Sequence, residues 1–227
     1  MQQFLSALHR AWLSKRLKHQ TQAQPLLTYL NTPSPNLQDT WQQGAYLVLD
    51  LETSGSDPLH DDILSFGWVI IRQEHIELAS ARHYLVQARR LLRERNVAIH
   101  HITDDQAAQG HPLTEVLTLF LTALSGKLLV AHYAPTELGF IKQACLNCFG
   151  AKPPIPTLDT LQLARRHPAT RHHSLRLVAL RSHYHLPRYA LHNALSDALA
   201  TAELLLAQLN TSPTLANLPL KDLITHT

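Results

Sequence analysis

The sequence contains little of what several protein classes require. Its two cysteines imply no secreted disulfide framework, and its 13 prolines and seven glycines follow no collagen-like period. No apolar run approaches the roughly 18 residues of a membrane-spanning helix, and the basic, amphipathic N-terminus lacks the apolar segment of a secretory signal. A hydrophobic content of 45% also argues against disorder. We therefore expect a soluble, cytoplasmic, globular protein.

Basic residues are concentrated in two segments. Residues 1–40 hold four basic side chains against one acidic residue, so this segment carries the whole net charge of +3. The window 160–196 contains six arginines, six histidines and no acidic residue. Such a local excess suits a polyanion, although a solvated basic surface explains it equally well.

The cysteines allow a zinc site as one alternative. Cys145 and Cys148 form a C-x-x-C pair, and His167 and His172 follow downstream. However, the gap between Cys148 and His167 exceeds the usual zinc-finger spacing, and prolines interrupt the place where a finger would begin its helix. Both cysteines also fall at helical spacing from Ile141, so we interpret their thiols as small, partly buried core groups.

The pattern of apolar residues predicts an α/β domain. Short apolar runs bounded by polar turns indicate strands, and amphipathic stretches indicate helices. The expected order is strands at 46–49, 63–71 and 76–86, a helix at 113–124, a strand at 128–130, a helix at 134–149, a strand at 153–158, and helices at 158–166, 174–182 and 194–209. These elements predict a mixed sheet of about five strands with helices on both sides.

Three segments are expected along the chain. Residues 1–40 form an amphipathic helical extension that ends in a breaker-rich stretch, and its apolar stripe favours docking on the rest of the protein. Binding of a partner and a basic contact to nucleic acid are the alternatives for this extension. Residues 41–210 form the α/β domain, and residues 211–227 form a short tail of uncertain order.

Carboxylates are expected to gather at one edge of the sheet. Asp50 and Glu52 end the first strand and project from the same face, about 7 Å apart, because side chains alternate along a strand. Glu137 follows the fourth strand, and Asp197 lies in the first turn of the last long helix. Taken singly, they also fit a solvated acidic pair or carboxylates that stabilise a helix N-terminus. Together they offer the hard oxygen ligands that Mg2+ or Mn2+ prefers.

The order of these motifs resembles the DEDDh 3'-to-5' exonucleases, the family of the proofreading epsilon subunit of bacterial DNA polymerase, RNase T and oligoribonuclease. The first motif is VLDLETSG at 48–55, the second is HYAPTE at 132–137, and the third is HNALSDA at 192–198. His101 and Asp159 begin two further segments, H-I-T and D-T-L, that are similar to those of the family.

The second motif departs from the family pattern H-N-x-x-F-D. Tyr133 replaces the Asn, Thr136 replaces the Phe and Glu137 replaces the Asp, which gives a DEEDh set. Glutamate keeps the charge and extends the carboxylate by one methylene, so a metal ligand can survive there. The third motif matches the histidine class, because His192 stands five residues before the last Asp, whereas Asn193 occupies the position of the tyrosine in the sister group.

The resemblance implies a ribonuclease H-like fold and hydrolysis with two divalent cations, Mg2+ or Mn2+. By this resemblance Asp50 bridges both ions, Glu52 and Asp197 hold the first, and Glu137 supports the second. His192 would then be the general base, which suits its ordinary pKa near 6.5.

The resemblance also implies a substrate and the residues that contact it. Thr53, Ser54 and Gly55 would contact the terminal sugar and its 3'-OH, and His132 would either touch the scissile region or, equally, have a structural role. The expected activity releases nucleoside 5'-monophosphates from single-stranded 3' ends, with DNA favoured over RNA. An RNA- or oligonucleotide-trimming exoribonuclease and a catalytically decayed nucleic-acid-binding scaffold are the alternatives. The N-terminal helix could bind a polymerase or another protein, and the oligomeric state is left open.

Overall fold

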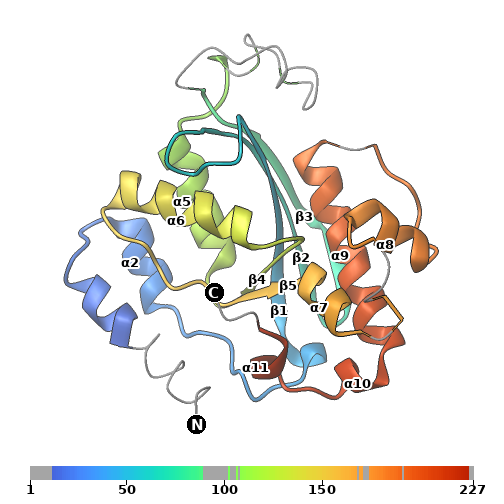
Figure 1. The fold of residues 1–227 in the computed structure, drawn as a ribbon. Coiled ribbons are helices and arrows are strands. Elements are labelled where there is room, and N and C mark those ends of the chain that lie inside the picture. Colours follow the sequence, from blue (N-terminus) through green and yellow to red (C-terminus); the bar gives the residue numbers. More distant parts are fainter. Residues whose placement is uncertain are drawn as a thin grey trace.

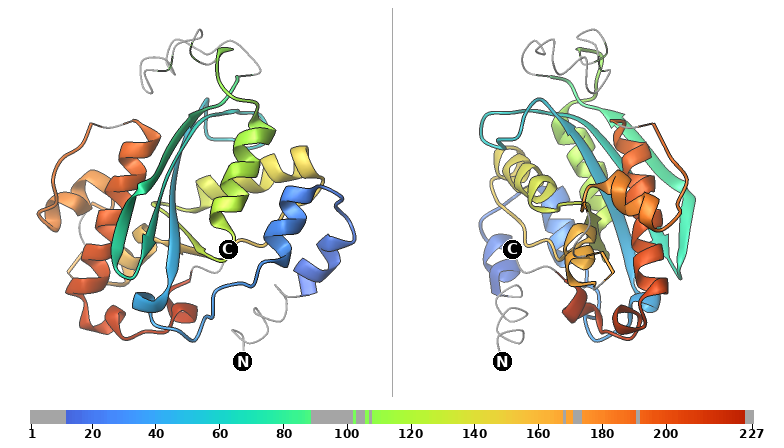
Figure 2. Two further views of the ribbon diagram at one scale, coloured as in Figure 1. Left: turned by 180° about the vertical axis from the view of Figure 1, so that it is seen from behind. Right: turned by 45° about the vertical axis from the view of Figure 1, so that its right-hand side comes forward.

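The computed structural model places a five-stranded sheet between two layers of helices (Figures 1 and 2). It describes residues 12–88, 102, 106, 108–167, 169–170, 174–190 and 192–224. The sheet order is β3-β2-β1-β4-β5. The strands are β1 (Ala45–Thr53), β2 (Ile63–Arg72), β3 (His75–Leu85), β4 (Leu128–Ala131) and β5 (Thr157–Asp159). β2 is antiparallel to β1 and β3, and β4 is parallel to β1 and β5. The predicted α/β class with a mixed five-stranded sheet is confirmed.

Helices cover both faces of the sheet. One layer holds α2 (Gln24–Asn31), α5 (Leu113–Leu124) and α6 (Pro135–Phe149), and the other holds α7 (Thr160–Arg166), α8 (Leu177–His183) and α9 (Ala194–Thr211) (Figure 2). The short helices η1 (Trp41–Gln43), α10 (Pro213–Ala216) and α11 (Leu220–Leu223) lie at the lower end of the sheet in Figure 1. In the part of the chain that the structure describes, no helix has the length and apolar character needed to cross a membrane.

The two faces of β1 belong to different cores. Leu47, Leu49 and Leu51 pack in the core with α2, α5 and α6. Tyr46 and Val48 pack in the core with α9. Because successive side chains of a strand point to opposite faces, the residues at positions 50 and 52 lie on the α9 side. The sheet therefore aims both carboxylates toward the layer that contains α9.

The described part of the N-terminal extension docks on this body. Leu17, Leu26 and Leu30 are buried in the core with α5 and α6, and the Tyr29 hydroxyl donates to the Pro154 carbonyl at 3.0 Å. This contact agrees with the docking that the apolar stripe favours. The apolar positions before residue 12 lie outside the described residues.

The segment after α9 is packed rather than free. Leu215, Leu220 and Leu223 are buried in the same core as Tyr46 and Val48. The Leu220 amide donates to the Asp39 carbonyl and the Lys221 amide to the Leu37 carbonyl, both at 2.9 Å. Residues 212–224 therefore close the lower end of the sheet, which differs from the expected tail of uncertain order.

β5 is shorter than expected, and proline explains the difference. The prediction placed a strand at 153–158, but the ladder with β4 begins only at Thr157. Pro153, Pro154 and Pro156 have no N–H to donate, so this stretch contributes to the sheet only through the Pro156 carbonyl, which accepts from the Leu129 amide at 3.0 Å.

Both cysteines lie on α6. Cys145 is fully buried and Cys148 is half-buried, and both thiols are free. Among the described residues, neither belongs to a group of three or more metal-ligating side chains. This placement agrees with the interpretation of both thiols as core groups, while His172 lies outside the described residues.

Candidate active site

The acidic pair of β1 stands beside a gap in the side chains of β2. Asp50 pairs with Gly67 and Glu52 with Ser65 in the antiparallel register. A β-carbon at Gly67 would overlap the backbone of Ala194 and Leu195, the first residues of α9. The glycine therefore lets the first turn of α9 rest directly on the sheet, next to Asp50.

The first turn of α9 carries Asp197 into this position. The Asn193 side chain caps the helix by accepting from the Ser196 amide at 3.1 Å. One oxygen of Asp197 accepts from the His192 amide at 3.0 Å, which fixes the orientation of the carboxylate. The helix dipole favours a carboxylate in the first turn of a helix. The N-terminus of α9, which rests on the sheet, therefore favours the negative charge of Asp197.

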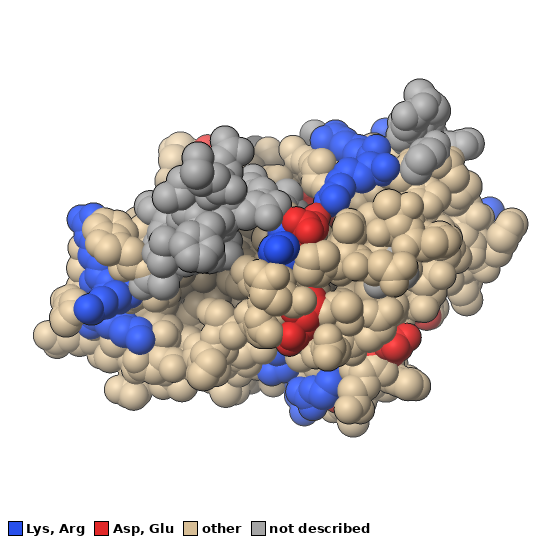
Figure 3. Space-filling view, turned by 90° about the horizontal axis from the view of Figure 1, so that it is seen from below, with Lys and Arg blue, Asp and Glu red and all other residues tan. Residues whose placement is uncertain are grey.

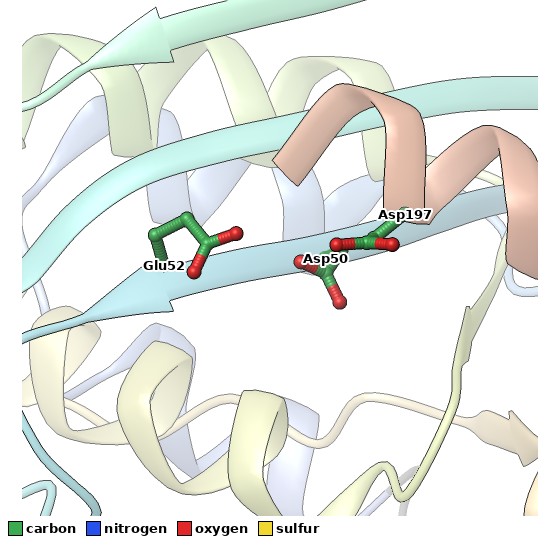
Figure 4. Close-up of side chains that lie close together, drawn as sticks. All are labelled: Asp50, Glu52 and Asp197. Atoms are coloured by element: carbon green, nitrogen blue, oxygen red, sulfur yellow. The ribbon is translucent and has the colours of Figure 1, made fainter. Parts of the chain in front are cut away.

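Asp50, Glu52 and Asp197 form one cluster (Figure 4). Each offers a carboxylate oxygen, and these three oxygens lie within 4.8 Å of one another. Among the described residues, this is the group of acidic, histidine and cysteine side chains whose spacing suits a metal ion. The structure therefore brings three of the four expected ligands into one place.

Glu137 lies next to the cluster rather than inside it. It occupies the first turn of α6, directly after β4, and is only 6% exposed. Its Oε2 atom is buried with no hydrogen-bond partner. Its negative charge contributes to the raised pKa of Asp50, so the two carboxylates are close enough to repel each other.

Asp50, Glu137 and Asp197 each resist ionisation. Burial, followed by the charges of Glu137, Glu52 and Asp197, raises the pKa of Asp50 well above its ordinary value. Burial also raises the pKa of Glu137 to about 8, and burial and the charge of Glu52 raise the pKa of Asp197. Four carboxylates held so close are unfavourable unless protons or cations accompany them.

A fifth carboxylate, that of Asp159, is part of this environment. Asp159 ends β5 and is 1% exposed. Its Oδ1 atom accepts from the Tyr133 amide at 3.0 Å and the Leu161 amide at 2.9 Å, while Oδ2 is buried without a partner. Its charge adds to the raised pKa of Glu137. The D-T-L segment pointed to Asp159, but its effect on Glu137 depends on tertiary contacts that no local sequence pattern reveals.

His192 stands at the open side of the cluster. Its side chain is exposed, and its charge acts on Asp197, so the imidazole and this carboxylate are neighbours. The backbone of His192 is left-handed, with φ of 63°, an uncommon conformation for a residue other than glycine. The turn that starts α9 thus holds the imidazole beside the acidic cluster.

The environment of His132 fits the structural one of its two expected roles. Its Nδ1 atom lies 2.8 Å from the Thr160 hydroxyl and its Nε2 atom 3.0 Å from the Leu175 carbonyl. Burial lowers its pKa. Both ring nitrogens are therefore engaged within the protein, and in this structure His132 joins β4 to α7 and to the segment before α8 instead of presenting a nitrogen to a substrate.

Thr53, Ser54 and Gly55 form a turn that its own neighbours hold in place. The Thr53 hydroxyl donates to the Gly55 carbonyl at 2.7 Å, and the Ser54 hydroxyl accepts from the Asp62 amide at 2.9 Å. A β-carbon at Gly55 would overlap the carboxylate of Asp61. The turn follows directly after Glu52 and so lies beside the acidic cluster. Its two hydroxyl groups are already engaged in hydrogen bonds within the protein.

The basic window 160–196 is only partly available to a polyanion. Arg181 is 5% exposed and pairs with Glu203 at 2.7 Å, and Arg166 donates to the Asp222 carbonyl at 2.7 Å. Arg165, Arg176 and Arg188 are exposed. On the lower face of the molecule, lysine and arginine side chains stand in separate groups instead of one continuous stripe (Figure 3).

The donor set fits divalent cations. All the candidate ligands are carboxylate oxygens, which suit hard cations such as Mg2+ and Mn2+. The unpartnered, buried Oε2 atom of Glu137 and the raised pKa of Asp50 both indicate missing positive charge. Asp50, Glu52 and Asp197 have the spacing to hold one such ion.

The sequence profile of the exonuclease family matches residues 47–205, an interval that contains the whole acidic cluster. The chain belongs to this family. The resemblance of its motifs to the DEDDh 3'-to-5' exonucleases is therefore confirmed. The DNA polymerase III PolC-type protein of Thermotoga maritima is 32% identical over 173 residues, which cover 75% of this chain and 12% of that protein.

Another relative is named a subunit of the same polymerase. The DNA polymerase III subunit epsilon-like protein of Rhodobacter capsulatus is 33% identical over 160 residues, which cover 70% of this chain and 23% of that protein. The chain thus spans only a small part of the length of these curated relatives. Their activities, substrates and partners come to it only as proposals.

Solved exonucleases share the fold of this chain. Exonuclease X in complex with 5' overhanging duplex DNA has a TM-score of 0.60 and 24% identity, covering 74% of this chain and 92% of that chain. E. coli exonuclease I in complex with a dA16 oligonucleotide has a TM-score of 0.68 and 16% identity, covering 76% of this chain and 42% of that chain. The ribonuclease H-like fold that the resemblance implied is confirmed.

Proposed function

We propose that the protein is a metal-dependent 3'-to-5' exonuclease that releases nucleoside 5'-monophosphates from single-stranded DNA ends. The observation that carries this proposal is the convergence of Asp50, Glu52 and Asp197, whose carboxylate oxygens lie within 4.8 Å of one another. Membership of the exonuclease family supports the same reaction.

Each acidic residue has a distinct part in the proposal. Burial, followed by the charges of Glu137, Glu52 and Asp197, raises the pKa of Asp50, so this carboxylate has acidic neighbours from both proposed ion sites, and its part is to touch both ions. Glu52 and Asp197 complete the first ion site, and Glu137 supports the second. When bound, two such cations would supply an activated water and stabilise the departing 3'-oxygen.

His192 is proposed as the general base. An imidazole with an ordinary pKa near 6.5 can accept a proton from water at neutral pH. The hydrogen bond from its backbone amide to Asp197 keeps the residue at the cluster, and its exposed ring can return the proton to solvent. Thr53, Ser54 and Gly55 are proposed to pack against the terminal nucleotide through their backbone, because the hydroxyl groups are engaged within the turn.

A nuclease assay with 5'-labelled single strands tests the proposal. Matched DNA and RNA oligomers are incubated with Mg2+ or Mn2+, with and without a chelator, and a circular single-stranded DNA serves as the control without ends. We expect a ladder shortened from the 3' end, dependent on metal, with the circle intact and with DNA cleaved faster than RNA. Asp197→Asn is the matched inactive variant.

The other outcomes identify the alternatives. Faster cleavage of RNA would favour the exoribonuclease, and metal-dependent binding without digestion would favour the decayed scaffold. Cleavage of the circle would overturn the exonuclease assignment. A polymerase partner for the N-terminal helix and a cytoplasmic location remain predictions from the sequence.

A further inference from the structure

A cavity of about 280 Å³ adjoins the acidic cluster on the side of α8. Its walls come from α8, from the loop between α8 and α9, and from the first turns of α9. Leu177, Leu186 and Tyr189 contribute apolar groups to its lining, and Asp197 contributes a carboxylate. Because Asp197 also belongs to the acidic cluster, the cavity opens next to the proposed site of hydrolysis.

Tyr189 presents an aromatic ring at this cavity in a fixed orientation. Its hydroxyl donates to the Glu203 carboxylate at 2.6 Å, and the guanidinium of Arg181 lies over the ring at 4.8 Å from its centre. Arg181 is itself held by Glu203 and by the Pro187 carbonyl, both at 2.7 Å. Tyr189 as a residue nevertheless remains 41% exposed. A ring that is both exposed and oriented loses little conformational freedom when a flat ligand stacks on it.

We propose that this cavity binds a nucleobase of the substrate strand, at one of the two nucleotides that flank the scissile phosphate, through stacking on Tyr189. The inference rests on the proposed nuclease function and deepens it. Aromatic platforms beside basic groups are the usual means of binding single strands without sequence preference. Arg188 lines the same cavity and is exposed, so it can neutralise a neighbouring phosphate.

The position of the cavity favours a nucleobase over other apolar ligands. Asp197 belongs both to the cavity lining and to the acidic cluster, which would attract the phosphodiester once it held cations, so a strand held there would bring its bases past the ring. Arg181 covers one face of the ring and α8 borders the cavity, which leaves space of the size that small planar ligands fill.

The test compares binding of two short oligodeoxynucleotides, a normal strand and one whose last two nucleotides are abasic. Binding is measured by fluorescence anisotropy in Ca2+, which takes carboxylate ligands and serves here to hold the strand during the measurement. We expect the wild-type protein to prefer the normal strand by about ten-fold, the size of one base–aromatic stack. Tyr189→Ala should bind both strands equally, and Tyr189→Phe, which keeps the ring, should retain the preference.

A second variant distinguishes loss of the stacking ring from local unfolding of the loop in Tyr189→Ala. Val178 lines the cavity and is exposed, so Val178→Trp can fill the cavity without a change in the core. This variant should lose the preference for the normal strand while its melting temperature stays near that of the wild type. An unchanged preference in both Tyr189→Ala and Val178→Trp would overturn the proposal. Digestion of 5'-labelled DNA, measured separately, reports on the nuclease function, so failure of one proposal is distinguishable from failure of the other.

Discussion

Gly67 lies directly opposite Asp50 in the sheet, and its missing side chain makes the space that the first turn of α9 occupies. Gly67→Ala should therefore push α9 away from β1 and separate Asp197 from Asp50. We expect a loss of about 1–3 kcal/mol in the free energy of unfolding and a drop of about a hundred-fold in kcat. Urea unfolding and steady-state digestion measure the two effects.

Ser65→Ala is the matched control for this change. Ser65 lies on the same strand and the same face, opposite Glu52, and its buried hydroxyl has no hydrogen-bond partner. The substitution adds no atoms, so activity should stay within a few-fold of the wild type. Equal effects of Gly67→Ala and Ser65→Ala would contradict the spatial argument.

His192 should be separable from the metal ligands by substitution. His192→Asn removes the base but keeps a residue type that tolerates the left-handed backbone at this position. We expect kcat to fall by about a hundred- to ten-thousand-fold, the usual contribution of a general base, with Mn2+ affinity and melting temperature unchanged. Calorimetric titration of Mn2+ and single-turnover digestion test this, and near-normal turnover would remove His192 from the mechanism.

Asp50→Asn should stabilise the metal-free protein while it abolishes turnover. Burial, and after it the charges of three neighbours, oppose ionisation of Asp50, so a neutral amide avoids both costs. We expect the melting temperature in chelator to rise by about 2–4 °C for each kcal/mol gained. In Mn2+ the order should reverse, because a ligand is lost. A lower melting temperature than the wild type in chelator would mean that the carboxylate has a partner other than a cation.

Glu137 predicts a specific dependence of stability on pH. The pKa of Glu137 is about 8 in the folded protein and 4.5 is its ordinary value, so between these values the folded state keeps a proton that the unfolded chain releases. The contribution of Glu137 to the free energy of unfolding in chelator should therefore be most favourable below pH 4.5. This contribution should be lost as the pH rises toward 8. The slope is at most about 1.4 kcal/mol per pH unit.

Glu137→Gln isolates this contribution. The amide is neutral at every pH, so the wild type should become progressively less stable than Glu137→Gln between pH 5 and pH 8 in chelator, as measured by chemical denaturation. Mg2+ or Mn2+ should reduce the difference, since a cation replaces the proton. A difference that does not vary with pH would show that Glu137 is ionised throughout.

The length of Glu137 is open to a direct test. Glu137→Asp shortens the side chain by one methylene and restores the carboxylate that the family usually has at this position. We expect retained digestion with a changed ratio of the rates in Mg2+ and Mn2+. Complete inactivity would show instead that the buried surroundings, including Asp159, are fitted to the longer side chain.

Much of the fold could be predicted because apolar periodicity is a local property. The strands at 63–71 and 76–86 and the helix at 113–124 were expected nearly to their ends. β1 continues past the apolar run 46–49, because Asp50 and Glu52 still pair with β2. That extension depends on a partner strand, which no local pattern reveals.

The candidate site was predicted through carboxylates at the ends of elements, and the missing parts are those that depend on tertiary contacts. The sequence around Gly67 predicts a strand like any other. The need for a glycine there becomes apparent only when α9 is seen to pack against its backbone. Asp159 is buried, and its carboxylate accepts hydrogen bonds from two backbone amides. Arg181 was expected to belong to a basic surface, but it donates hydrogen bonds to Glu203 and to two backbone carbonyls.

More than half of the chain separates Asp50 from Asp197. A polypeptide still emerging from the ribosome therefore has the β1 carboxylates long before it has the helix that completes them. Until α9 has been synthesised and has settled on Gly67, the nascent protein lacks the means to cut a phosphodiester. On the ribosome the chain thus carries an incomplete acidic cluster for more than half of its synthesis and completes it only near the end.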